Sequence, residues 1–168
     1  MLELNAIDAE SNVPFVVGHF EETNRHIDAS DVKRVYDLFN GHTFYIQKTF
    51  NESFADTREG EVCTLDTIRT AINNIIASND TIFREILSNI PEKQKELLYA
   101  IAKDGKAEQI TSAEFIKRHR LTSASSVQSA TKKLLEKDII TERNKVYSLN
   151  DKLFAMWINK LYGNTTML

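Results

Sequence analysis

The chain of 168 residues contains few of the residues that mark several common classes of protein. Its single cysteine can form neither an internal disulfide nor a zinc site by itself. The five glycines stand far apart, at positions 18, 41, 60, 105 and 163, whereas a phosphate-binding loop needs closely spaced glycines followed by lysine. No apolar run approaches the roughly 18 residues that span a bilayer. We therefore expect neither nucleotide hydrolysis by this chain alone nor membrane insertion.

Other catalytic and targeting signals are missing as well. The histidines at positions 19, 26, 42 and 119 are dispersed, and none has the spacing of a metal site. Cys63 stands at the start of an expected helix, where the helix dipole could favour a thiolate, but no base is nearby, so an ordinary half-buried cysteine is favoured. The first residues, MLELNAIDAE, lack the basic and then apolar pattern of a secretory signal. We expect no metal, no catalytic residue and a cytoplasmic location.

The charges that are present are unevenly distributed. Residues 91–168 contain 14 Lys and Arg against 9 Asp and Glu, whereas residues 1–90 contain 7 against 15. Opposite net charges suggest two modules with different partners, although a merely solvated surface would give the same count. The segment Asn89-Ile90-Pro91 is the best boundary, which gives a helical module at 1–90 and a second module at 91–168.

The second module has the pattern of a winged helix. We expect helices at 92–103, 112–119 and 124–137, followed by strands at 138–141 and 145–149 joined through residues 142–144. Gly105 ends the first helix, and Thr111 with Glu114 forms a capping box for the second. Ser123 is the expected N-cap of the third helix, and a last helix begins at Asn150 or Asp151. Three helices followed by a hairpin are typical of this fold.

Residues 1–90 are expected to be mostly helical. Pro14 favours an extended segment at 13–17, because proline biases the residue before it away from helix. Apolar residues at helical spacing predict helices at about 31–40, 43–55, 65–78 and 81–88. His42 precedes the second of these and is expected to cap it. The fold class is mainly α, with a helical subdomain followed by a winged helix-turn-helix that has a small β-hairpin wing.

Two short motifs carry a resemblance to a known family. The first runs from Gly41 to Gln47, with His42 and Tyr45 between them, and the second contains Asp151, Phe154 and Trp157. In this order, with a winged helix between them, they resemble the C-terminal lid and winged-helix region of archaeal-type AAA/STAND P-loop ATPases. Thr43 stands where that family usually has proline. The resemblance implies a nucleotide-lid role for Gly41, His42 and Thr43, an ATPase core in cis or a protein partner, and ATP with magnesium in a longer parent protein.

The winged helix suggests a contact with double-stranded DNA. In a helix-turn-helix the second helix enters the major groove, where Gln128 can read adenine and lysines can contact phosphates. The candidate DNA-binding residues are Lys117, Arg118, Arg120, Ser125, Ser126, Gln128, Ser129, Lys132, Lys133, Arg143 and Lys145. Short polar residues also simply start helices, and many winged helices dock proteins or inhibit their own ATPase. A protein-docking or autoinhibitory module without DNA binding therefore remains the alternative.

Overall fold

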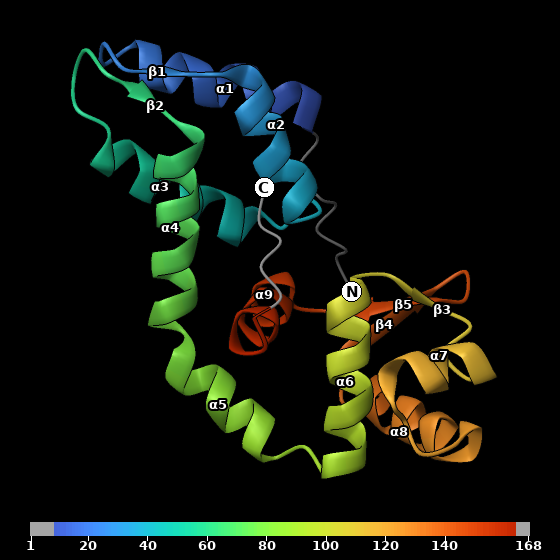
Figure 1. The fold of residues 1–168 in the computed structure, drawn as a ribbon. Helices are drawn as coiled ribbons and strands as arrows, with labels where there is room; N and C mark the ends of the chain where they lie inside the picture. Colours follow the sequence, from blue (N-terminus) through green and yellow to red (C-terminus); the bar gives the residue numbers. More distant parts are fainter. Residues whose placement is uncertain (1–8, 164–168) are drawn as a thin grey trace. The chain divides into compact units, whose positions relative to one another are not determined.

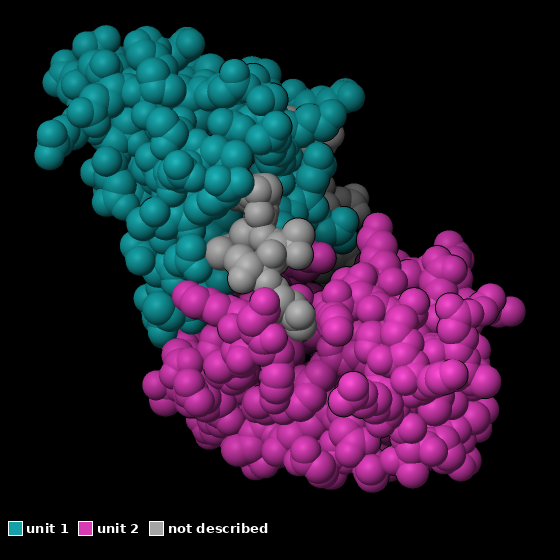
Figure 2. All heavy atoms as spheres, in the orientation of Figure 1, with its two compact units in different colours: residues 1–78, 167–168 teal, residues 79–166 magenta. Residues whose placement is uncertain are grey.

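A computed structural model describes residues 9–163 and divides the chain into two compact units after Ser78 (Figures 1 and 2). The first unit contains α1 (Ala9–Glu21), β1 (His26–Ile27), α2 (Ala29–Leu38), α3 (Thr43–Asp56), β2 (Val62–Cys63) and α4 (Leu65–Ser78). The second contains α5 (Asp80–Ser88), α6 (Glu92–Asp104), β3 (Ala107–Glu108), α7 (Ala113–His119), α8 (Ala124–Glu136), β4 (Ile140–Arg143), β5 (Val146–Leu149) and α9 (Lys152–Leu161). The predicted fold class is confirmed.

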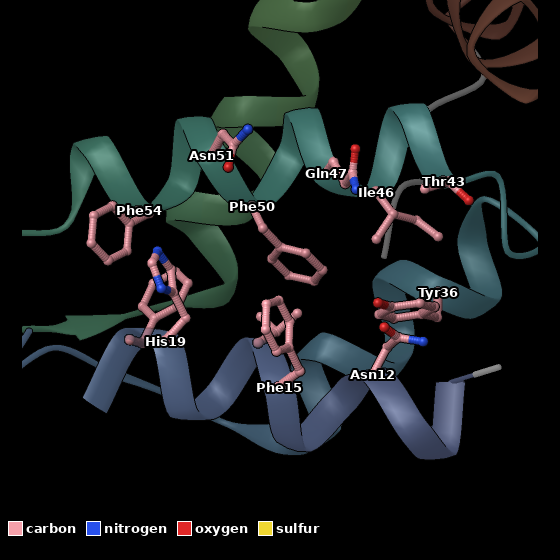
Figure 3. A pocket seen from close by; sticks show the side chains of 12 residues that line it. Asn12, Phe15, His19, Tyr36, Thr43, Ile46, Gln47, Phe50, Asn51 and Phe54 are labelled. Carbon is pink, nitrogen blue, oxygen red and sulfur yellow. The ribbon is translucent and has the colours of Figure 1, made fainter. Parts of the chain in front are cut away.

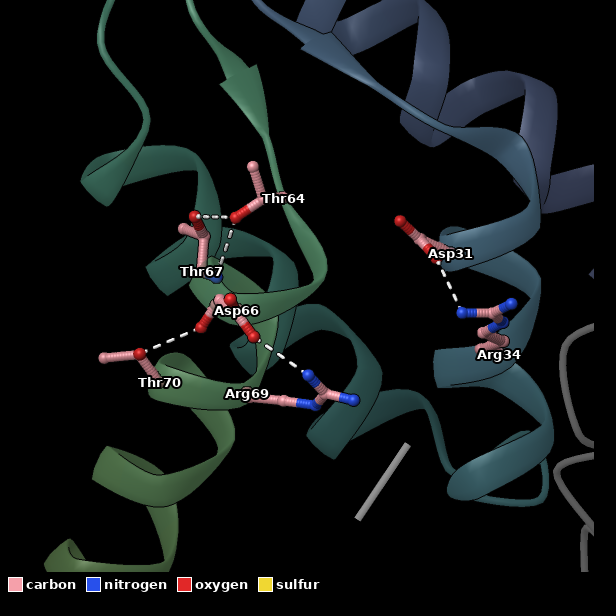
Figure 4. A network of polar contacts seen from close by, with 7 residues as sticks. All are labelled: Asp31, Arg34, Thr64, Asp66, Thr67, Arg69 and Thr70. Carbon is pink, nitrogen blue, oxygen red and sulfur yellow. Dashed lines mark hydrogen bonds and ion pairs between the residues drawn. The ribbon is translucent and has the colours of Figure 1, made fainter.

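The core of the first unit is built around α4, which packs on α3. Ile68, Ile72 and Ile75 follow one another at helical spacing and are fully buried, so α4 presents one continuous apolar face. The opposite side of the same helix is polar. At its start the Thr64 hydroxyl accepts a hydrogen bond from the Thr67 amide at 3.2 Å and so caps the helix (Figure 4).

Exposed ion pairs lie on two helices of this unit, α2 and α4. Arg69 donates to Asp66 at 2.8 Å within α4, and Arg34 donates to Asp31 at 3.3 Å within α2 (Figure 4). Both pairs join residues one helical turn apart, a spacing that favours helix by a few tenths of a kcal/mol. They are local stabilisers of their own helices.

The expectation of an extended segment around Pro14 is wrong, because this proline lies inside α1. The apolar residues Val13, Val16, Val17 and Phe20 recur at helical spacing, and Phe20 is almost completely buried. Val13, Val16 and Val17 are half-buried, so one face of α1 is apolar and packs inward although Pro14 cannot donate a helical hydrogen bond. α1 packs on α2, an arrangement that no local signal predicted.

A short parallel pairing of β1 with β2 was also missed. His26 is opposite Val62 and Ile27 is opposite Cys63, which brings together two segments about 35 residues apart. Arg25 strengthens this junction, because its Nε donates to the Thr57 carbonyl at 2.7 Å. Strands of two residues carry almost no sequence pattern, so they could not be expected from periodicity.

The second unit has the architecture of a winged helix (Figure 1). α6 packs on α8, and their contact buries Leu98, Ile101 and Leu134. β3, β5 and β4 form an antiparallel sheet in that order. The strand β3 was not expected; Ala107 pairs with Tyr147 and Glu108 pairs with Val146.

The wing differs in detail from the expected hairpin. β4 extends to Arg143, which pairs with Val146, so the connection is the two-residue turn Asn144-Lys145 and not residues 142–144. Both turn residues have positive φ, 53° and 65°. This is the geometry of a type I′ turn, whose twist matches that of the flanking strands. Arg143 is consequently a strand residue and Lys145 a turn residue.

The cap of α7 also differs from the expectation. Ser112, not Thr111, is the N-cap, because its hydroxyl accepts from the Phe115 amide at 3.2 Å. Two further capping predictions are confirmed: Ser123 accepts from the Ser126 amide, and Asp151 accepts from the amides of Leu153 and Phe154. These caps fix where α8 and α9 begin.

α5 belongs to the compact unit of the winged helix. The Trp157 indole N–H donates to Asp80 at 2.9 Å, and Phe83 packs on both Phe154 and Trp157. The compact unit therefore begins well before the boundary expected at Pro91. The assignment of residues 1–90 and 91–168 to separate functional modules stays a prediction.

Candidate nucleic-acid interface

The first turns of α8 present an uncharged polar surface to solvent. Ser125, Gln128 and Ser129 are exposed, whereas Val127, Ala130 and Leu134 on the opposite side are buried. Ser126 differs from its neighbours in being half-buried, and its backbone amide donates to the Ser123 cap. Three of the four predicted base-reading residues are thus accessible along one helix.

The two lysines on α8 differ in whether they form an ion pair. Both Lys132 and Lys133 are exposed. Lys133 donates to Glu136 at 2.8 Å, and this hydrogen bond lowers the pKa of the Glu136 carboxyl. Within residues 9–163, Lys132 has no ion-pair partner within 4.0 Å, although its charge also helps to lower the pKa of Glu136. Lys132 is therefore the cation of α8 that is free to meet an external anion.

The basic cluster of α7 is partly neutralised by a residue that the sequence did not reveal. The guanidinium of Arg118 donates to Asp104 at 3.0 Å and lies 5.6 Å from the centre of the Phe115 ring. The His119 ring lies 3.1 Å from the same carboxylate oxygen. Asp104 ends α6, so this clasp fixes the end of α7 against it. No local pattern indicated it, because the partners are 14 and 15 residues apart.

The remaining predicted cations are exposed on short elements. Lys117 lies in α7, and Arg120 ends that helix in the left-handed conformation with φ of 55°. Arg143 ends β4 and Lys145 lies in the turn of the wing. Among the described residues none of these four has an ion-pair partner within 4.0 Å. Together with Lys132 they form what we call the free cation set: Lys117, Arg120, Lys132, Arg143 and Lys145.

The predicted nucleotide-lid residues lie in the first unit, where α2 gives way to α3. Gly41 has φ of 74° and makes the turn that a side chain would disfavour. His42 is the N-cap residue of α3, as expected, but its side chain does not contribute to the cap. Its ring instead stacks on Tyr45 with 4.8 Å between ring centres, and it makes no capping hydrogen bond. Thr43 begins α3.

Other reactive groups do not form a site in the described part of the chain. No cluster of three or more His, Cys, Asp or Glu side chains is placed to hold a metal ion there. Cys63 is buried, and its burial raises the pKa of the thiol. A thiol held protonated is a poor nucleophile, in agreement with the ordinary cysteine that the sequence favoured. Over residues 9–163, none of the helices is long and apolar enough to cross a membrane.

The comparisons with known proteins agree with this architecture. Residues 81–160 match a family model described as "Probable winged helix domain". The second unit is thus a winged-helix domain, and the match begins at α5, which the structure also assigns to that unit.

The whole chain also resembles part of a larger solved protein. Its fold matches the Walker-type ATPase of Pyrococcus abyssi with a TM-score of 0.67 and 14% sequence identity. The match covers 92% of this chain and 42% of that ATPase chain. Identity at this level establishes a shared fold. Among curated proteins, no match to the sequence was found.

Proposed function

We propose that the winged-helix unit binds double-stranded DNA through α8, and that the chain is a regulatory part of an AAA/STAND-type ATPase without catalysis of its own. The observation that carries the proposal is the uncovered polar row of Ser125, Gln128 and Ser129, with Lys132 one turn further along. The major groove of B-DNA is about 12 Å wide and admits one α-helix. Uncharged side chains at the start of that helix are then close to the base edges.

The free cation set supplies the electrostatic part of this interaction. Lys117 and Arg120 precede α8 along the chain, and Arg143 and Lys145 follow it on the wing. Phosphate contacts from such flanking elements fix the position of the recognition helix without reading sequence. Arg118 and Lys133 contribute less in this state, because Asp104 and Glu136 already neutralise them.

The test is fluorescence anisotropy with a labelled random-sequence duplex, titrated at several salt concentrations. Binding in the micromolar range that weakens steeply with salt supports the proposal, because each phosphate contact releases a counterion. Absence of binding at low salt refutes it. Gln128→Ala is the informative companion variant: it should change preference among duplexes of different sequence and leave the salt dependence unaltered.

A second candidate function is protein docking, and one observation favours it. Ile82 and Ile86 lie one turn apart on α5 and are 55% and 38% exposed. Ile86 borders a groove of about 500 Å³ that Ile90, Ile139 and Phe154 also line. Exposed apolar surface of this kind marks many protein interfaces. Docking is the function of this unit if two results hold. The parent protein binds a protein partner but no DNA, and the double variant Ile82→Ser with Ile86→Ser no longer binds that partner.

The role of the first unit follows from the same resemblance. We propose that Gly41, His42 and Thr43 belong to a lid that faces a nucleotide held by an ATPase core in cis or in a partner. ATP and magnesium would be bound by that core. His42 is the residue to test: the His42→Ala variant should alter ATP hydrolysis by the assembled protein and leave DNA binding by the second unit unchanged.

A further inference from the structure

A pocket of about 120 Å³ lies between α1 and α3 in the first unit (Figure 3). Its walls are mainly aromatic. His19 stacks on Phe54 and Phe20 meets the same ring edge-on, each with 5.1 Å between ring centres. Tyr36 and Phe50 form a second tilted pair at 6.3 Å. Because the rings support one another, the walls of the pocket are formed before any ligand enters.

One aromatic residue of the pocket is open to solvent. Phe15 lines it from α1, with its ring directed toward α3, and is 73% exposed (Figure 3). An exposed phenylalanine leaves apolar area in contact with water, which is unfavourable. A flat ligand lying against this ring would remove that area from water. Phe15 therefore provides a contact surface that the described residues of this unit leave unused.

The rim of the pocket is polar and carries no charge that is fixed at neutral pH. Thr43, Gln47 and Asn51 recur every four residues on α3, so they lie along the same side of that helix. The two amides offer both donors and acceptors. Among the described residues that line the pocket, none is Asp, Glu, Lys or Arg. A charged ligand would lose hydration there without gaining a counter-charge, so the lining selects a neutral one.

We propose that this pocket binds a small neutral aromatic compound, with its ring against Phe15 and Phe50 and its polar edge toward Gln47 or Asn51. The enclosed volume suits about one ring, since an engineered protein cavity of about 150 Å³ binds benzene. A small fused ring would extend from it along the exposed face of Phe15. The site is independent of the proposed DNA contact, because all its residues lie in the first unit. It also differs from a phosphate site, since no cation lines it.

Indole is the probe that fits these features, with a fused ring and one N–H donor. We expect saturable shifts of amide resonances in α1 and α3 on titration into the 15N-labelled full chain. We expect a Kd of roughly millimolar, which lies within the affinity ceiling for a ligand of about nine non-hydrogen atoms. Indole-3-acetate, which adds a carboxylate, should bind at least about tenfold more weakly. Absence of saturation, or equal affinity for the two compounds, overturns the proposal.

Variants locate the binding. Val16→Phe places a ring in the cavity and should abolish the indole shifts, whereas Phe44→Ala, an exposed residue of the same helix α3 that does not line the pocket, should leave them unchanged. The double rim variant Gln47→Ala with Asn51→Ala changes only exposed positions, so it should fold. It tests the proposal if Val16→Phe does not fold. 1-Methylindole lacks the N–H donor of indole, so the parent should bind it more weakly than indole. The rim variant lacks the amide acceptors for that N–H, so it should bind indole as weakly as the parent binds 1-methylindole. Unchanged indole affinity in the rim variant, or in a folded Val16→Phe variant, refutes the assignment.

Discussion

Replacement of Lys132 by alanine gives the sharpest test of the proposed DNA interface. Lys132 is exposed on α8 next to the uncharged polar row, and it has no ion pair among the described residues. Its removal should weaken binding to all duplexes to a similar extent, because a phosphate contact carries no sequence information. The neighbouring Lys133 already neutralises Glu136, so its removal also leaves an unpaired carboxylate near the duplex.

The size of the effect follows from the number of free cations. If all five residues of the free cation set contact phosphates, the slope of log K against log salt is about −4.5, at −0.9 for each contact. Raising the salt from 50 to 200 mM then weakens binding by roughly 500-fold. Without Lys132 the slope is about −3.6, and the same change of salt weakens binding by roughly 150-fold. The double variant of Lys132 and Lys133 should lower the slope at least as far.

The assay is an anisotropy titration at four or more salt concentrations for the parent and each variant. Lys33→Ala is the matched control, since it removes one exposed positive charge from α2 in the first unit. The affinity and the slope of this control should differ from those of the parent only by the small effect of removing one positive charge from the protein. A slope for Lys132→Ala equal to that of the parent would show that α8 does not face the phosphates. The proposed docking face would then be wrong.

Three further predictions follow from other contacts. Lys145→Gly should raise the free energy of unfolding by about 0.5–1 kcal/mol in urea titrations, since Lys145 has positive φ in a turn that favours Asn-Gly; destabilisation would contradict the turn. Asp104→Ala should steepen the salt slope of DNA binding by freeing Arg118, and an unchanged slope would place Arg118 away from DNA. The hydrogen bond from Arg84 lowers the pKa of Asp80. The stability that this pair gives the folded state is therefore present above the ordinary pKa of 3.8 and is lost as the pH falls through the lowered pKa. Asp80→Asn should therefore flatten the acid limb of the stability curve, and an unaltered limb would exclude this pair as its source.

Sequence patterns predicted those elements whose signals are local. The helices α3, α4, α6 and α8 each combine apolar residues at helical spacing with a recognisable cap or stop. Gly105, for example, ends α6 with φ of 70°, as its freedom to adopt positive φ predicts. Because the wing follows α8 directly, the winged-helix fold could be inferred from this stretch alone.

The missed features all depend on partners distant in the sequence. α1 is helical despite Pro14 because Phe20 is buried in the first unit, and β1 requires β2. The Asp104 clasp joins two helices whose own sequences contain no sign of it. For the candidate site, sequence identified the exposed row on α8 but not which cations are free, since an ion pair depends on tertiary geometry.

The DNA face, the groove beside α5 and the aromatic pocket occupy separate residues, so their tests can be interpreted separately, whereas Thr43 belongs both to the proposed lid and to the lining of the pocket. The DNA face involves α7, α8 and the wing, the apolar groove is bordered by α5 and α9, and the aromatic pocket lies between α1 and α3. If the DNA affinity of the parent protein does not change with salt concentration, the proposed DNA face is refuted, while indole binding and protein docking can still be tested. Loss of all three activities in one variant would instead indicate unfolding, because no single side chain contributes to all of them. DNA binding that persists while the indole site fails would exclude the aromatic pocket as a ligand site and leave both the DNA face and the proposed lid in place.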